Sequence, residues 1–188
     1  KKEGLELLPW LMHFFTDEKN GIRLEAIESL PRLPGEPESL VAALKELCKD
    51  EKHFIREAAA RKLVERGNLD EIAILEDAAP SEKNIAALGE SRNIEVVGLL
   101  INAFQDKSEP ALRMHAAIAL GKHMHWGLPE VTRVLVGELE STAPSQMLFR
   151  KLVVNILRKH GHTDNLDLLE RVEQEMAEAF PAMASVDE

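Results

Sequence analysis

Apolar residues recur every three or four positions along almost the whole chain, whereas the alternation typical of a β-strand is almost absent. Proline and glycine interrupt the pattern at intervals of ordinary helix length. Gly67 and Gly161 are predicted to end two of the segments, because glycine suits the left-handed conformation that follows many helices. The pattern predicts helices near residues 4–16, 22–33, 37–49, 53–66, 69–78, 81–90, 93–105, 110–124, 128–141, 145–160 and 164–179.

Four of the predicted helices share one sequence pattern. A large apolar residue precedes an arginine, a small or β-branched residue follows three positions after it, and leucine follows seven positions after it. The arginines are Arg23, Arg56, Arg113 and Arg150. The long gap before the third arginine leaves room for an abbreviated repeat at 69–90, which lacks the arginine. We therefore predict about five helical hairpins, near residues 4–33, 37–66, 69–90, 93–124 and 128–160.

The repeated apolar positions fall on one face of each helix, and a single hairpin cannot bury such a face. Stacked hairpins bury it between them, so we predict a single repeat domain over residues 1–180. The amphipathic segment 164–179 is predicted to cap the last hairpin, and residues 181–188 are predicted to fray.

Acidic residues precede three of the repeat arginines at a nearly constant spacing of six or seven positions. An acid in the turn inside one hairpin can meet an arginine of the following helix. Repetition along the stack then predicts a ladder of ion pairs. Its predicted members are Asp17, Arg23, Asp50, Arg56, Asp106, Arg113 and Arg150.

The pattern Asp-x5-Val/Ile-Arg-x2-Ala-x3-Leu resembles the HEAT repeat, in particular the short HEAT-like repeats named after phycobilisome lyases. The closest matches are the segments with Asp50, Arg56 and Leu63 and with Arg113 and Leu120. The resemblance covers residues 4–160. It implies an all-α fold, a right-handed α-α superhelix or HEAT-like solenoid, whose second helices line a concave face. It does not imply one particular function.

The composition supports an all-α chain. Tyrosine is absent and aromatic residues make up 4% of the chain, which disfavours β-sandwiches and barrels. No apolar run is long enough to span a bilayer. The chain carries a single cysteine, Cys48, and it begins without Met or an apolar signal region, as an excerpt of a longer protein also can. We therefore expect no membrane association and a cytoplasmic location.

The formal net charge is −10, with 23 basic and 33 acidic residues. Residues 164–188 hold eight acidic residues and one basic residue, so most of the excess lies in this segment. The rest of the chain is nearly balanced, but it has no continuous basic stripe. Nucleic-acid binding is therefore disfavoured, because a phosphate backbone requires a basic face.

Two His-x-His pairs, His123 with His125 and His160 with His162, lie at equivalent ends of neighbouring repeats. Four imidazoles at one edge indicate a speculative metal site, since imidazole binds zinc, nickel and copper. The alternative is that they complement the carboxyl ends of helices. No histidine is followed by glutamate, unlike in the HEAT-like di-iron hydroxylases, and common catalytic motifs are absent. We expect no cofactor and lean towards a protein that is not an enzyme.

Positions two, five and nine residues after each repeat arginine are expected to point away from the packed face. In the last two complete repeats these positions mix apolar and basic residues, which suits a partner helix or peptide. The leading prediction is a non-enzymatic scaffold or adaptor that binds another protein through the concave face. The alternatives are a phycobilin-lyase-like enzyme or accessory subunit and a metal-binding protein, and a homo-oligomer stays open. The candidate binding residues are Arg61, His115, Ile118, Lys122, Leu152, Asn155 and Lys159.

Overall fold

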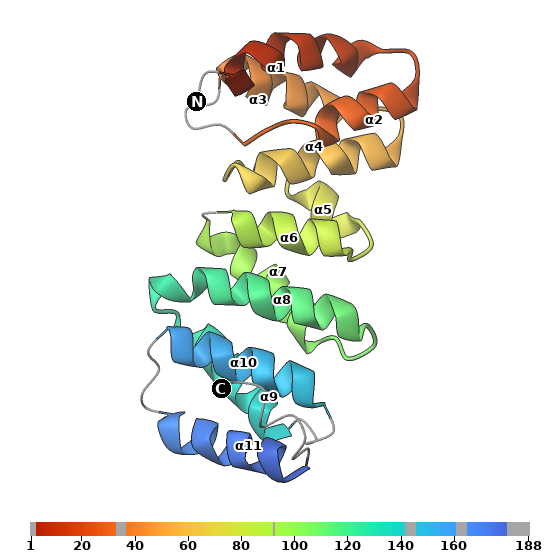
Figure 1. The fold of residues 1–188 in the computed structure, drawn as a ribbon. Coiled ribbons are helices and arrows are strands. Elements are labelled where there is room, and N and C mark those ends of the chain that lie inside the picture. The colour runs from red at the N-terminus through yellow and green to blue at the C-terminus, as the bar shows by residue number, and fades with distance from the viewer. Residues whose placement is uncertain (1–2, 33–36, 92, 142–145, 161–164, 180–188) are drawn as a thin grey trace. The chain divides into compact units, whose positions relative to one another are not determined.

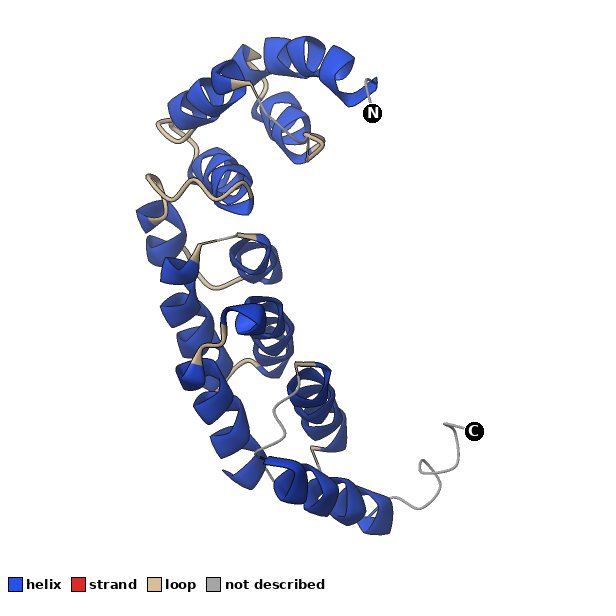
Figure 2. Cartoon of the chain, turned by 90° about the vertical axis from the view of Figure 1, so that its left-hand side faces the viewer, coloured by secondary structure: helices blue, strands red, loops and turns tan. Residues whose placement is uncertain are grey.

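The computed structural model describes residues 3–32, 37–91, 93–141, 146–160 and 165–179. These residues form helices, turns and loops, and no strand occurs among them (Figure 2). The chain divides into two compact units, residues 1–96 and residues 97–188, which we call unit 1 and unit 2. The all-α prediction is confirmed, with helical pairs packed as in a HEAT-like solenoid.

Unit 1 contains six α-helices and two short 3₁₀ helices in its described residues (Figure 1). The second helices of its hairpins pack on each other in chain order, α2 on α4 and α4 on α6. Its elements are α1 (Glu3–His13), η1 (Phe14–Thr16), α2 (Asn20–Glu28), α3 (Glu38–Leu47), α4 (His53–Glu65), α5 (Ala73–Asp77), α6 (Glu82–Glu90) and η2 (Ile94–Val96).

Unit 2 contains five α-helices and one 3₁₀ helix in the part of it that is described. Its second helix α8 packs on α7 and on α10, and α10 packs on α9 and α11. The elements are α7 (Val97–Gln105), α8 (Pro110–His123), η3 (Met124–Trp126), α9 (Pro129–Ser141), α10 (Met147–Lys159) and α11 (Leu166–Ala179). The capping helix predicted over 164–179 thus corresponds to α11, which packs on the last hairpin.

Each predicted helical segment overlaps one of these α-helices, and the largest boundary error is at α2. This helix ends at Glu28 instead of near residue 33. The reason is Pro31, which has no N–H to continue the helix and disfavours helical backbone at Leu30. Gly67 ends α4 with φ +80°, as predicted, whereas Gly161 lies outside the described residues.

Small residues at the repeated positions allow the second helices to approach closely. Three consecutive alanines of α4, residues 58–60, are fully buried, and α8 buries Ala116, Ala117 and Ala119. Larger side chains such as Leu63 and Leu120 fill the space between the layers and are also fully buried. Each unit therefore has its own core. The right-handed superhelix, the single domain over 1–180 and the fraying of 181–188 stay predictions.

Candidate protein-binding face

Helices α8 and α10 lie side by side in unit 2 (Figure 1). A Cβ atom added to Gly121 would lie 3.1 Å from Cγ2 of Ile156. Eight residues earlier, the guanidinium carbon of Arg113 lies 4.5 Å from the ring centroid of Phe149. Residues of α8 thus face residues about 35 positions later in α10. This register brings Met114 and Ile118 level with the segment of α10 between Leu148 and Leu152.

Four apolar side chains at these levels lie on the outer side of the two helices. Counted from the repeat arginines, their positions fall within about 100° of one another around the helix axis. Leu148 is 68% exposed and Ile118 is 44% exposed, while Met114 is also exposed and Leu152 is half-buried. We call Met114, Ile118, Leu148 and Leu152 the α8–α10 patch.

Basic side chains surround the α8–α10 patch. Lys122 of α8 and Lys151 and Lys159 of α10 are exposed, as is Asn155. Neither α8 nor α10 contains an aspartate or glutamate, although the chain has 33 acidic residues. His115 is half-buried, and its Nδ1 atom lies 2.9 Å from the carbonyl oxygen of Ala111. The structure therefore brings together the predicted residues of the last two repeats on an apolar and basic face. The absence of acids from these helices is a signal that the sequence reasoning did not use.

Arg61 does not belong to such a face, and the expectation that it is exposed is wrong. It is 7% exposed and forms ion pairs with Glu28 at 2.7 Å and Glu57 at 3.0 Å. Its Nη1 also donates to Oδ1 of Asn84 over 3.3 Å. The physical reason is that α4 packs between α2 and α6, so that position five residues after the arginine is covered from both sides.

The Arg61 cluster links three helices of unit 1. Glu28 of α2 also accepts a hydrogen bond from Lys83 of α6 over 3.0 Å. Burial alone would raise the pKa of Glu28, but the hydrogen bond from Lys83 and the positive charge of Arg61 hold this pKa below its usual value. Glu28 therefore stays ionised within the cluster, which has a structural role in joining α2, α4 and α6.

The predicted ion-pair ladder has a different geometry in unit 1 from the one expected. Arg23 donates to the backbone carbonyl of Asp17 over 2.8 Å, and its ion pair is with Asp50 of the next hairpin at 2.9 Å. Arg56 likewise donates to the carbonyl of Asp50 over 2.9 Å. The carboxylate of Asp17 instead accepts the backbone N–H of Lys19 over 2.8 Å. Burial of Asp50 would raise its pKa, but the N–H of Lys52 and the charge of Arg23 lower it.

In unit 2 the repeat arginines pair with glutamates that the sequence reasoning missed. Arg113 pairs with Glu138 of α9 at 2.5 Å and donates to the carbonyl of Phe104 over 3.0 Å. Arg150 pairs with Glu175 of α11 at 2.7 Å. Both glutamates stand 25 residues after their arginine, a shared spacing that could have revealed them.

Asp106 is not the carboxylate that pairs with Arg113, so this part of the predicted ladder is wrong. The Asp106 carboxylate accepts the hydroxyl of Ser108 over 2.6 Å and its N–H over 2.9 Å. These two hydrogen bonds lower the pKa of Asp106. The physical reason is local: an aspartate in a turn bonds to the backbone two residues later more readily than to a distant side chain.

The first histidine pair, His123 with His125, packs on an aromatic residue. The rings of His123 and His125 pack edge-on against Trp126, with centroids 5.3 Å and 5.1 Å away. Within the described ranges, no group of three or more His, Cys, Asp or Glu side chains is arranged to hold a metal ion. His160 is half-buried, and His162 lies outside those ranges. A metal site at this edge stays a prediction.

Cys48 is buried at the end of α3. Burial, with a smaller contribution from the negative charge of Glu71, raises the pKa of the thiol to about 12. The thiolate needed for nucleophilic chemistry is therefore scarce at neutral pH. Cys48 therefore packs as a small apolar side chain.

Comparison with known proteins supports the repeat assignment. The family model described as HEAT repeats matches residues 8–85. This confirms the HEAT-repeat resemblance over those residues, and HEAT repeats are generally protein-interaction scaffolds. No curated protein matches the chain. In the portion of the chain that the structure describes, no helix is long and apolar enough to cross a membrane.

Proposed function

We propose that this chain, whose residues 8–85 match the HEAT repeats, is a scaffold or adaptor that binds another protein through the α8–α10 patch. The observation that carries the proposal is the pairing of exposed apolar side chains with two helices that hold basic residues and no acidic ones. Exposed apolar side chains that gather on one face, rimmed by polar groups, are typical of an interaction surface.

The patch favours an amphipathic partner helix with acidic flanks. Apolar side chains spaced by three or four residues would cover Ile118 and Leu148, and glutamates or aspartates beside them would meet Lys122 and Lys159. The charged rim would speed association and disfavour basic partners, while the apolar contacts would supply most of the affinity. The basic rim therefore sets the class of partner.

Buried interactions hold the patch in shape before any partner binds. Arg113 and Arg150 tie α8 and α10 to the helices that follow them, and Arg113 also packs against Phe149 of α10. Because these groups are already ordered, binding does not require the two helices to be assembled. Preorganisation of this kind lowers the entropic cost of association.

The test is a cross-linked pull-down from the source cell with the parent chain and with Ile118→Glu combined with Leu148→Glu. The proposal expects the captured proteins to fall about tenfold with the double variant, because two carboxylates then lie in the apolar contact. The control is Ile94→Glu, which places the same charge on an exposed apolar side chain of unit 1. Equal capture by the parent and the double variant would contradict the proposal.

The proposal extends to further binding residues, to the location of the protein and to its oligomeric state. His115, Leu152, Asn155 and Lys159 are proposed to contribute to binding because they border the patch. A cytoplasmic location and a homo-oligomer are kept as proposals, and sedimentation of the purified chain tests the second. The phycobilin-lyase-like alternative has no described residue in its favour, and incubation with a bilin and its acceptor protein tests it.

A further inference from the structure

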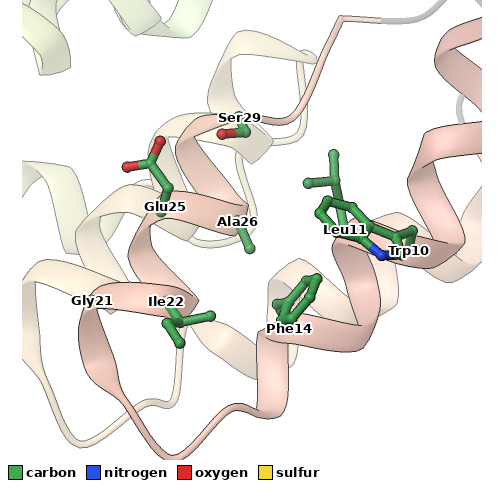
Figure 3. A pocket seen from close by; sticks show the side chains of 8 residues that line it. All are labelled: Trp10, Leu11, Phe14, Gly21, Ile22, Glu25, Ala26 and Ser29. Carbon is green, nitrogen blue, oxygen red and sulfur yellow. The ribbon is translucent and has the colours of Figure 1, made fainter.

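A second candidate surface lies in unit 1, at the first hairpin. A pocket of about 340 Å³ opens between α1 and α2 (Figure 3). This volume is near the lower end of the roughly 300–1,000 Å³ range of ligand pockets, enough for one or two large side chains. The lining residues are Trp10, Leu11, Phe14, Gly21, Ile22, Glu25, Ala26 and Ser29.

The pocket continues an exposed apolar stripe of α1. Trp10 and Phe14 pack edge-to-face with ring centroids 4.8 Å apart, and Trp10 is 61% exposed. Leu7, one turn earlier, is also exposed. The neighbouring stripe of the same helix, which includes Leu8 and Leu11, is buried in unit 1, and Leu11 also lines the pocket. Helix α1 therefore has two apolar stripes, of which the hairpin covers one.

The charged residue among those that line the pocket is Glu25, an acid. Glu25 stands at the pocket and Glu6 stands beside Leu7, and neither forms an ion pair with a described residue. Residues 3–29 contain six acidic and two basic residues. One of the two bases, Arg23, is engaged by Asp50 of the next hairpin. A ligand at this pocket thus meets apolar walls with negative charge at the edge.

We propose that the pocket between α1 and α2 binds an amphipathic helix of another protein, with an apolar side chain in the pocket and a lysine or arginine beside Glu25. The charge complementarity selects a basic helix over an acidic one. A helix fits because the hairpins of unit 1 already pack helix against helix in this way, as α4 does with α2 and α6. This goes beyond the proposed function, because the α8–α10 patch selects the opposite charge.

The test uses two synthetic helical peptides of about 18 residues, a length at which a helix forms on binding. One carries leucines on one face and lysines on the other, and its matched partner has glutamate in place of each lysine. Binding to the full chain is followed by fluorescence anisotropy of labelled peptide. A second readout is the emission of Trp10 in a Trp126→Phe background, which leaves Trp10 as the sole tryptophan.

The proposal expects the basic peptide to bind and to shift Trp10 emission to the blue, because the indole leaves water. Glu25→Lys and Trp10→Ala are each expected to weaken it about tenfold. Trp10 is exposed, so its removal leaves the core intact, and circular dichroism checks the fold. Glu95→Lys is the matched control, an exposed carboxylate of η2 with the same charge change, and it is expected to leave binding within about twofold.

Other outcomes overturn the proposal. An equal shift of Trp10 emission with the acidic peptide shows that charge does not select the ligand of the pocket, and an equal loss with Glu95→Lys shows attraction to the net charge alone. Unchanged binding with Trp10→Ala shows that the pocket is not used. Self-association of the peptide-free chain that Trp10→Ala abolishes shows that a second copy is the occupant. Binding of the acidic peptide without a shift of Trp10 emission reports on the α8–α10 patch and not on this pocket, so the two proposals fail separately.

Discussion

The two units use the same arginine position but different carboxylates to join successive hairpins. In unit 1, Arg23 pairs with Asp50, which lies in the loop between α3 and α4. In unit 2, Arg113 and Arg150 pair with glutamates on the first helix of the next hairpin or on the capping helix. The guanidinium is thus the constant member of these ion pairs. Its partner is a carboxylate 25 to 27 residues later, which comes from a loop in unit 1 and from a helix in unit 2.

The units also differ in the charge that surrounds their exposed apolar side chains. Carboxylates border the pocket of unit 1, whereas lysines border the α8–α10 patch of unit 2. The net charge of −10 does not show this contrast, because it sums an acidic surface that favours basic partners and a basic surface that favours acidic ones. The class of partner therefore has to be inferred from the charges around each unit's own apolar surface.

The largest expected effect comes from breaking the arginine pair of unit 2. Arg113→Ala should lower the free energy of unfolding of unit 2 by about 3 kcal/mol, because it leaves the carboxylate of Glu138 largely buried without its closest cation. It also removes the guanidinium that packs against Phe149. Hydrogen exchange resolved by mass spectrometry measures α8 and α10 separately from unit 1.

Arg133→Ala is the control for this variant. Arg133 is exposed, and its nitrogen lies 3.9 Å from a carboxylate oxygen of Glu130, so its removal should cost less than about 0.5 kcal/mol. If Arg113→Ala matched Arg133→Ala, the buried pair would not be what joins the hairpins of unit 2.

A smaller effect is expected where α8 and α10 touch. Gly121→Val should destabilise unit 2 by about 2 kcal/mol, since its Cβ would already lie 3.1 Å from Ile156 before the methyl groups are counted. Urea unfolding followed by Trp126 fluorescence measures this change. Gly137→Ala in α9, where a Cβ meets nothing within 4 Å, should instead stabilise by about 0.5 kcal/mol. A neutral Gly121→Val would show that the helices separate at no cost.

The smallest effect concerns the loop carboxylate of unit 1. Asp50→Asn should cost about 1 kcal/mol at neutral pH, because the hydrogen bond from Arg23 loses its ionic character while the bond from Lys52 keeps an acceptor. Asp17→Asn is the matched control, since its carboxylate accepts the equivalent bond from Lys19 without an arginine partner. Hydrogen exchange of α2 and α4 compares the two variants.

The pH dependence gives an independent check on Asp50. Its pKa is lower in the folded chain than in the unfolded chain, so its stabilising contribution is complete above the unfolded value of about 3.9. The contribution is lost as the pH falls through the folded pKa. Between about pH 6 and pH 3 the parent should therefore lose more stability in unit 1 than Asp50→Asn. Parallel losses in both proteins would assign the pair no ionic contribution.

The helices were predictable because each has apolar residues every three or four positions and a glycine, proline or turn residue near its end. The predictions near Gly67 were accurate, since a residue with φ +80° ends a helix for local reasons. The error at α2 was also local, and Pro31 would have corrected it. Helices α5 and α6 were located from spacing, and they bury Leu75 and Ile85, whereas the abbreviated hairpin over 69–90 stays a prediction.

The contacts between side chains were less predictable, since they depend on how hairpins pack. Position counting from the arginine placed Ile118 correctly on an exposed face but failed for Arg61, which lies on a helix covered from both sides. The ladder failed at Asp17 and Asp106, because turn aspartates satisfy nearby N–H groups first. Glu138 and Glu175 were missed because no pattern within one helix singles them out.

In unit 2 the two arginines and the two glutamates that pair with them repeat at the same spacing, so one hairpin could replace another. Arg113 and Arg150 are 37 residues apart, and so are Glu138 and Glu175, because 150 − 113 and 175 − 138 give the same number. Excising the 37 residues 114–150 would bring Glu175 to the place of Glu138. The shortened chain would keep one cation, one carboxylate and one capping helix in register. In evolution, such a chain can gain or lose a hairpin by duplication or deletion and still keep an arginine–glutamate ion pair between successive hairpins.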